Sequence, residues 1–293
     1  MGHMRQKTIG YLFVMPAIVI LGWLIVLPLC RAIWYSLLSW DGVGPSRFVG
    51  AQNYEQIVSQ SIERGSLYNA LILFVFFCLI PTGLGLIAIG LLGRRQQRSN
   101  AVFRVILFLP QVLVTVVVAI VWTWLMAPFG TGTINGLLHA VGLGPVVGPS
   151  WLGGFSTALG AIGVIAVWLD VGLCFVLFLA GVQRIPADLY DAARIDGAGI
   201  IREFIHVTVP LLRREIGAAI TITAVAGLGS FTLVFEATNG GPGSATVIPG
   251  LLVYRDAFTL GDVGGATALG VSMAVMIFVI TFGIRRGFER RAV

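Results

Sequence analysis

The sequence predicts an all-α membrane protein that crosses the bilayer six times, because of its composition and its six long apolar stretches. Of the 293 residues, 57% are hydrophobic and only 11% are charged, and the mean hydropathy is +0.94. Soluble domains carry about 25% charged residues. Each stretch holds about the 20 apolar residues that a helix needs to cross a bilayer with its backbone groups paired internally. We therefore expect one transmembrane domain over residues 1–293.

The first predicted span should remain in the membrane as an anchor. It follows Met1-Gly2-His3-Met4, and its apolar run is too long for the core of a signal peptide. Prolines such as Pro81 and Pro110 predict local kinks or helix ends, since proline lacks the backbone N–H that a helix interior uses. The six predicted spans are approximately Ile9–Cys30, Leu67–Leu92, Phe103–Met126, Leu159–Val182, Ile216–Phe235 and Val263–Ile284.

Cationic side chains gather on one side of these spans. Both ends of the chain, the loop after the second span and the loop at residues 184–214 carry most of them. Cytoplasmic loops are enriched in Lys and Arg, so both termini and the 184–214 loop are predicted to be cytoplasmic. The opposite side carries only Arg31, Arg47, Arg64 and Arg255.

Several classes of function find no support in the residue types present. The net charge of +6 would suit nucleic acid, but the cations lie in short clusters between apolar runs and set topology. The single lysine, Lys7, is not part of a Gly-x-x-x-x-Gly-Lys phosphate loop. His139 and His206 are isolated, and the three cysteines lack metal-ligand spacing. We expect no catalytic residue, metal or cofactor in this chain, and no nucleic-acid partner.

The cytoplasmic loop at residues 184–214, here called the coupling loop, is patterned for structure rather than as a linker. Pro186 suits a helix start, Asp188 lies near the positive N-terminal end, and Gly197 suits a left-handed C-terminal cap. A second helical stretch follows and ends before Pro210. We therefore predict a helix, a turn and a second helix.

The first of the two predicted helices, which follows Pro186, has small side chains at Ala192 and Ala193 on one face. Such a helix can press closely into a cleft, where Asp191 and Asp196 would meet cationic or backbone donors. The sequence therefore indicates a docking surface for another protein. A cytoplasmic loop that binds no partner is the alternative interpretation.

Here the sequence resembles the permease subunits of binding-protein-dependent ABC importers. Their cytoplasmic signature runs Glu-Ala-Ala, two residues, Asp-Gly-Ala, five residues, Phe, and later Pro, and this spacing is kept throughout. Asp191 stands where the family usually has Glu, one methylene shorter with the charge retained. The matching residues are Asp191, Ala192, Ala193, Asp196, Gly197, Ala198, Phe204 and Pro210.

Weaker similarities over nearly the whole chain point to the carbohydrate-uptake branch, as found in maltose and glycerol-phosphate systems. They include Phe108-Leu-Pro110, Asn135 and Thr238-Asn-Gly-Gly-Pro242. The segment Val253-Tyr-Arg-Asp-Ala-Phe258 resembles the first of the two permeases in such systems.

The resemblance implies a type I importer fold in a prokaryotic cell membrane and a sugar-like substrate. It also implies a second, non-identical permease, two ATP-binding cassette subunits that hold ATP and magnesium, and an extracytoplasmic solute-binding protein. The coupling loop would sit in a groove of the ATP-binding subunit and pass its closure to the membrane helices.

A candidate solute path lies in the fourth and fifth spans. Asp170 is midway along the fourth span, where an ionised carboxylate facing lipid would cost about 2.5–3.5 kcal/mol, so it should face the bundle interior or water. Thr223, Gly227 and Ser230 recur at helical spacing on the fifth span and would line the same cavity. Asp170 bonded only to a neighbouring helix, and hydroxyls bonded to their own backbone, remain alternatives.

Two other classes of function stay open at this point. An ion-gradient-driven secondary transporter would use Asp170 as a proton or cation site, and it would work without ATP. A membrane enzyme or assembly scaffold would need a paired nucleophile and base inside the membrane, which the sequence does not show. The sequence does not name the substrate, although Asp170 makes an anionic cargo less favourable.

Overall fold

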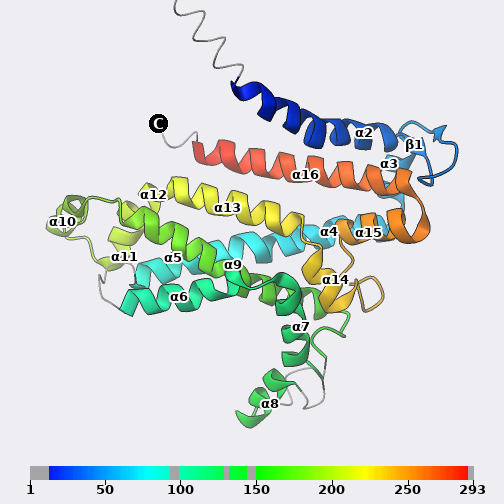
Figure 1. Ribbon diagram of the computed structural model, residues 1–293. Helices are drawn as coiled ribbons and strands as arrows, with labels where there is room; N and C mark the ends of the chain where they lie inside the picture. Colours follow the sequence, from blue (N-terminus) through cyan, green and yellow to red (C-terminus); the bar gives the residue numbers. More distant parts are fainter. Residues whose placement is uncertain (1–12, 93–98, 129–131, 144–149, 290–293) are drawn as a thin grey trace, which may run out of the picture. The chain divides into compact units, whose positions relative to one another are not determined.

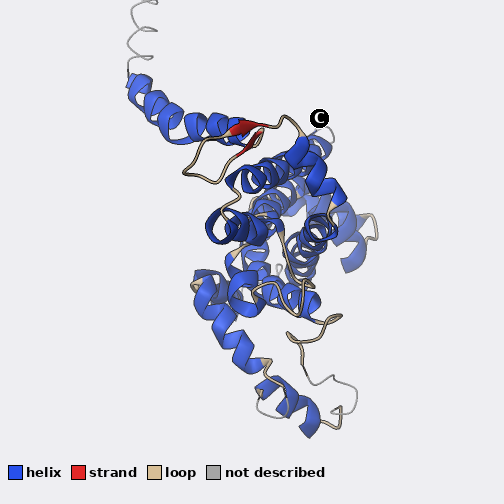
Figure 2. Cartoon of the chain, turned by 90° about the vertical axis from the view of Figure 1, so that its right-hand side faces the viewer, coloured by secondary structure: helices blue, strands red, loops and turns tan. Residues whose placement is uncertain are grey.

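The computed structural model describes residues 13–92, 99–128, 132–143 and 150–289, and in this part the chain is almost entirely helical (Figures 1 and 2). Residues 9–12 of the first predicted span, and several cations on which the predicted topology depends, lie outside these ranges. The only strands in the described part are β1 (Leu38–Ser39) and β2 (Arg47–Phe48), which pair antiparallel with Leu38 opposite Phe48.

The remaining elements are α-helices and short π-helical turns. In chain order they are η1 (Gly22–Val26), α2 (Leu27–Tyr35), α3 (Gln52–Ser59), α4 (Ser61–Phe74), η2 (Val75–Leu79), α5 (Ile80–Leu92), α6 (Ser99–Val112), α7 (Thr115–Leu125), α8 (Thr133–Ala140), α9 (Ala158–Val182), α10 (Ala187–Ile195), α11 (Ile200–Glu203), η4 (Phe204–Thr208), α12 (Val209–Leu211), α13 (Arg213–Leu228), α14 (Thr232–Thr238), α15 (Pro249–Arg255), η5 (Asp256–Leu260) and α16 (Val263–Glu289).

Four described helices are long and apolar enough to span a membrane, and there are six spans if each of two bent helix pairs counts as one. Every one of them overlaps a span predicted from the sequence, so the predicted all-α polytopic fold class is confirmed. The four are Phe13–Tyr35, Ser61–Leu91, Ala158–Val182 and Val263–Phe288, and the pairs are Val102–Val112 with Thr115–Leu125 and Arg213–Leu228 with Thr232–Thr238.

The third and fifth predicted spans, Phe103–Met126 and Ile216–Phe235, are not continuous helices. A local kink or end was predicted at Pro110 in the third span, whereas no break was predicted in the fifth. The third bends by 100° between α6 and α7, and the fifth by 46° between α13 and α14. In the third, the Leu113 amide donates to the Pro110 carbonyl at 3.1 Å, and Val114 is extended, with φ −66° and ψ 126°. In the fifth, Gly229 and Ser230 end the helix with a tightened turn in which the Ser230 amide donates to the Gly227 carbonyl at 3.2 Å.

The chain divides into two compact units, of which the first comprises residues 1–60 and 252–272. In its described part, the Asn53 side-chain amide donates to the carbonyls of Ser36 and Leu38 at 2.8 and 2.9 Å and so fixes α3 beneath β1. The backbone amide of Val263 donates to the Trp40 carbonyl at 3.0 Å, which joins the start of α16 to the loop after β1. The single domain expected over residues 1–293 stays a prediction.

The second unit, residues 61–251 and 273–293, is built around α9. This helix packs against α5, α6, α13 and η2, and Figure 1 shows α5, α6, α9 and α13 running alongside one another. Phe175 and Phe178 of α9 are almost fully buried in the core. At Gly172 the α6 backbone comes so close that a Cβ atom would lie 1.9 Å from the Leu107 carbonyl oxygen. The absence of a side chain therefore allows this helix contact.

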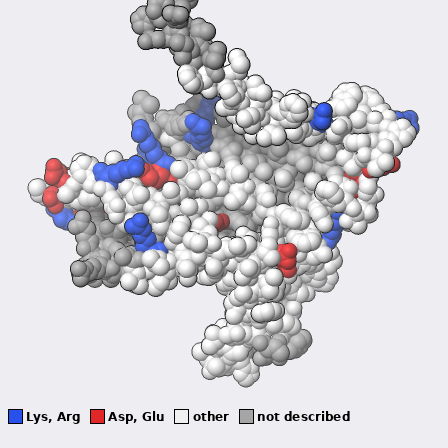
Figure 3. Space-filling view, viewed as in Figure 1, with Lys and Arg blue, Asp and Glu red and all other residues white. Residues whose placement is uncertain are grey.

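Few charged side chains lie in the middle of this unit, and Asp170 of α9 is one of them. On the face seen in Figure 3, Lys, Arg, Asp and Glu gather over the end that carries α10, whereas the central surface is nearly free of charge. An uncharged belt with charges at its end is expected for helices whose middle lies in hydrocarbon.

Candidate functional site

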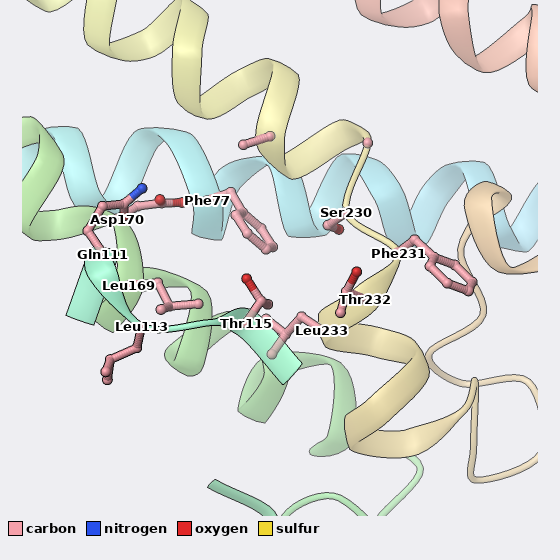
Figure 4. Close-up of a pocket in the computed structure, with 12 residues that line it drawn as sticks. Phe77, Gln111, Leu113, Thr115, Leu169, Asp170, Ser230, Phe231, Thr232 and Leu233 are labelled. Carbon is pink, nitrogen blue, oxygen red and sulfur yellow. The ribbon is translucent and has the colours of Figure 1, made fainter. Parts of the chain in front are cut away.

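A pocket of about 250 Å³ opens in the second unit between α9 and the two broken spans. Gln111, Leu113 and Thr115 come from the break between α6 and α7, and Gly229 through Thr232 come from the break between α13 and α14. Figure 4 shows Asp170 and Gln111 toward one end of this pocket and Ser230 and Phe231 toward the other. Helix breaks of this kind are tolerated at membrane depth where the irregular backbone lines a cavity.

Asp170 brings a carboxylate from α9 into this pocket. Its side chain is 6% exposed, and within the described part of the chain its Oδ2 atom has no hydrogen-bond partner. The Ser230 Oγ atom is likewise buried and unpartnered among the described residues. Buried polar atoms without partners cost free energy, so two of them in one pocket indicate that a polar ligand or water completes the site.

The other two residues predicted for the solute path lie behind the pocket. Thr223 is fully buried, and its hydroxyl donates to the Ala219 carbonyl one turn earlier at 2.9 Å. At Gly227 a Cβ atom would lie 2.5 Å from Phe77 Cβ, so this glycine permits close packing of α13 against η2. The structure thus places Asp170 and Ser230 toward opposite ends of one pocket, and places Thr223 and Gly227 in the helix packing of α13.

The polar residues Gln111, Thr115 and Thr232 line the pocket and were not among the residues predicted from sequence. Continuous helical spacing was assumed through the fifth span, and the size of the bend at Pro110 was not predicted. Both breaks change which residues share a face. The one available signal was Gln111, a polar residue directly after Pro110 in an otherwise apolar stretch.

The coupling loop forms the predicted helix, turn and helix, but the second helical stretch was predicted to end before Pro210 and instead continues through η4 and α12 to Leu211. Pro210 is tolerated because it lies in the first turn of α12. α10 begins after Pro186, and Gly197 has φ +78°, the left-handed conformation expected for its C-terminal cap. The Ala198 amide donates to the Ala193 carbonyl at 2.9 Å and closes the cap. Asp191 pairs with Arg194 at 3.1 Å and keeps 64% of its side chain exposed.

Side chains after the turn hold α10 in place. Arg194 Nε also contacts Glu203 Oε1 at 3.3 Å, and Glu203 is only 2% exposed. The hydroxyls of Tyr190 and Thr208 lie 3.1 Å apart. Phe204 packs against the buried core, close to Gly90 of α5. The coupling loop is therefore a fixed structure, with Phe204 joining it to the helix bundle.

Large apolar side chains are exposed on this polar loop. Ile195, Ile200 and Ile201 are 86%, 68% and 73% exposed, and they surround the turn at Gly197. Exposed apolar side chains grouped in this way, rimmed by charge, are typical of a protein-binding surface.

These features define a polytopic helical membrane protein with a polar pocket in its bundle and, at one end, an ordered loop that exposes apolar side chains. The chain belongs to the family of binding-protein-dependent transport system inner membrane components, whose model matches residues 80–293. It is therefore the membrane-spanning permease of an ABC transporter, and the permease is not the catalytic component of such a system.

Two relatives with curated names resemble nearly the whole chain. The probable ABC transporter permease protein YurN of Bacillus subtilis is 32% identical over 282 residues, covering 96% of this chain and 94% of the relative. The trehalose/maltose transport system permease protein MalF of Thermococcus litoralis is 32% identical over 281 residues, covering 94% and 92%.

A solved structure shares the fold. A chain of the bacterial alginate ABC transporter, in complex with a periplasmic protein that binds an alginate pentasaccharide, matches with a TM-score of 0.83 at 18% identity. The match covers 99% of this chain and 96% of that one. The type I importer permease fold expected from the resemblance is thus confirmed.

Proposed function

We propose that this chain forms half of the path by which an importer carries a sugar or a related polar solute across a prokaryotic cell membrane. This proposal rests on the pocket. It is lined by Asp170 and Ser230, each with an unpartnered oxygen atom, and by the polar side chains of Gln111, Thr115 and Thr232. Phe77 and Phe231 add aromatic surface. Such a pocket suits a sugar, because the sugar hydroxyls can donate hydrogen bonds to the carboxylate and the sugar ring can pack on an aromatic side chain. The trehalose/maltose relative supports this cargo class.

The second permease, two ATP-binding cassette subunits and an extracytoplasmic solute-binding protein complete the proposed importer. Structural similarity to a transporter solved with a periplasmic protein supports the last of these. This chain binds no cofactor of its own, and ATP with magnesium is held by the cassette subunits. Both termini and the coupling loop face the cytoplasm, as the cation distribution favours.

The coupling loop passes nucleotide-driven movement to the membrane helices. The exposed isoleucines and the Asp191 carboxylate present apolar and acidic contacts to the cassette subunit. Phe204 packs on the core of the bundle, and Arg194 pairs with Glu203, so the docking surface is attached to the bundle. A displacement of α10 by the cassette subunit therefore moves the core helices. The residues proposed to carry coupling are Asp191, Ala192, Ala193, Asp196, Gly197, Ala198, Phe204 and Pro210.

Reconstitution of the complete complex tests this function. The chain is co-purified with the subunits encoded beside it and placed in liposomes, and ATP hydrolysis is measured with candidate sugars presented by the binding protein. Sugar-stimulated hydrolysis and ATP-dependent uptake are expected. The double variant Asp191→Arg with Asp196→Arg should assemble the bundle and lose most of the stimulation, because it reverses the charge of the docking surface.

Glu55→Arg is the matched control, since it reverses an exposed carboxylate outside the coupling loop. It should leave sugar-stimulated hydrolysis unchanged. Uptake by this chain alone, without ATP, would refute the proposal and favour a secondary transporter that uses Asp170. Normal stimulation in the double aspartate variant would refute the coupling role.

A further inference from the structure

Among the described residues that line the pocket, one ionisable side chain has no group of opposite charge beside it. Of the 12 residues that line it, Asp170 is the only one with an ionisable side chain, and no Lys, Arg or His is among them. The other polar groups are the neutral Gln111 amide and the hydroxyls of Thr115, Ser230 and Thr232. The one carboxylate among these neutral polar and apolar side chains therefore dominates the electrostatic potential in the pocket.

The geometry gives this carboxylate a clear preference among ligand groups. Its Oδ2 atom has no partner in the described part of the chain, and a carboxylate accepts hydrogen bonds without donating any. Hydroxyl groups of a neutral sugar donate to it. A carboxylate or phosphate on the cargo would lie near a like charge in a medium that screens weakly, with no cation in the lining to offset the repulsion.

We propose that Asp170 is a charge-selectivity residue, which makes this pocket a site for neutral, hydroxyl-rich cargo and excludes anionic sugars. This inference rests on the proposed function of the pocket as part of the solute path. Membership of the family does not decide the point, because the systems similar to this chain include one named for trehalose and maltose and others for the acidic polysaccharide alginate.

Charge selectivity is measurable without knowing the cargo, by placing a thiol in the pocket. Ser230→Cys replaces the unpartnered hydroxyl by a thiol of similar size, in a Cys30→Ser background because Cys30 is exposed and Cys78 and Cys174 are buried. The probes are cationic trimethylammonium-ethyl and anionic sulfonatoethyl methanethiosulfonate. The thiolate attacks the sulfenyl sulfur of either reagent, forms a mixed disulfide and releases methanesulfinate.

The rates are measured on the complete complex in nanodiscs and divided by those at Ser59→Cys, an exposed serine position on α3. With Asp170 present, the cationic reagent should be favoured at the introduced pocket thiol by about tenfold or more, as expected where one charge focuses its field in a cleft. Asp170→Asn should remove this preference, and Asp170→Glu should keep it. Gln111→Glu adds a second carboxylate and should increase it, which provides a test even if Asp170→Asn does not assemble.

Three results would overturn the proposal: equal normalised rates for the two reagents with Asp170 present, a preference that Asp170→Asn leaves unchanged, or no reaction of the pocket thiol with either reagent. Labelling requires no ATP and no cargo. A complex that shows the expected labelling and no ATP-driven uptake would refute the proposed function and not the charge selectivity. A complex that transports sugar with no charge preference at the pocket thiol would refute the charge selectivity alone.

Discussion

At the scale of single residues, the contact at Gly172 is the tightest approach between α9 and a neighbouring helix backbone among the described glycines of α9. A side chain there has no space, because the atom it would meet is the Leu107 carbonyl oxygen rather than a flexible side-chain end. Leu107 is four residues before Gln111, so this contact also fixes the part of α6 that leads into the pocket.

We predict that Gly172→Ala destabilises the purified complex by about 1–3 kcal/mol, the usual cost of overpacking a filled core. Gly160→Ala on the same helix is the matched control, since nothing lies within 4 Å of its added Cβ. Thermal unfolding in detergent measures both variants. Equal transition temperatures for the two would contradict the tight contact between α6 and α9.

Residue identity alone indicated Asp170, because a carboxylate within an apolar span has few stable surroundings. Ser230 was predicted from its helical spacing with Thr223 and Gly227, and the structure places both Asp170 and Ser230 at the pocket. Thr223 is equally polar, but its hydroxyl bonds the preceding turn of its own helix. The sequence does not show whether a hydroxyl lines a pocket or bonds to the backbone of its own helix. That depends on which face of the helix the neighbouring helices cover.

At the scale of elements, the Gly197 cap determines where α10 ends and how the exposed isoleucines are arranged around it. Gly197 has φ +78°, and nothing lies within 4 Å of a Cβ built on it. Any effect of substitution there would therefore come from backbone conformation and not from a clash.

We predict that Gly197→Val lowers solute-stimulated ATP hydrolysis of the reconstituted complex by about tenfold, because a β-branched residue in the left-handed region costs about 1–2 kcal/mol or more. Gly197→Asn should retain most of the stimulation, since asparagine tolerates this conformation. Uptake and hydrolysis are measured together in liposomes. If valine and asparagine behave alike, the left-handed cap is not what positions the docking surface.

The helices and their approximate positions could be predicted from the sequence. An apolar run of about 20 residues in lipid must pair its backbone polar groups internally, which favours a helix. The α10 helix followed equally well from Pro186, Asp188 and Gly197, which act locally. The bends of 100° and 46° did not follow. Pro110 signalled a disturbance, but the size of a bend depends on what packs around it, and hydropathy carries no information on that packing.

At the scale of the whole molecule, the arrangement of charges predicts that the coupling loop and the loop after the first span face opposite sides of the membrane. Two variants in the Cys30→Ser background, each with one added cysteine, test this. Ser59→Cys lies on α3 after the first span, and Ala187→Cys begins α10, and both positions are exposed.

A membrane-impermeant maleimide should label Ser59→Cys in intact cells, and should label Ala187→Cys only after the membrane is permeabilised. The buried Cys78 and Cys174 provide the background control in the variant that lacks both new cysteines. Labelling of Ala187→Cys in intact cells would reverse the predicted orientation and remove the cytoplasmic setting that the coupling role needs.

The helix α9 leads from the pocket to the start of the coupling loop. It runs unbroken from Ala158 to Val182, while the two spans that share the pocket with it are bent there. At 1.5 Å per residue, the carboxylate-bearing position 170 lies about 18 Å from the end of the helix at Val182, and α10 begins five residues later. In the proposed importer, this continuous helix would carry a displacement of the coupling loop to the part of the pocket wall that holds Asp170, and the bends in the two flanking spans would let that wall turn.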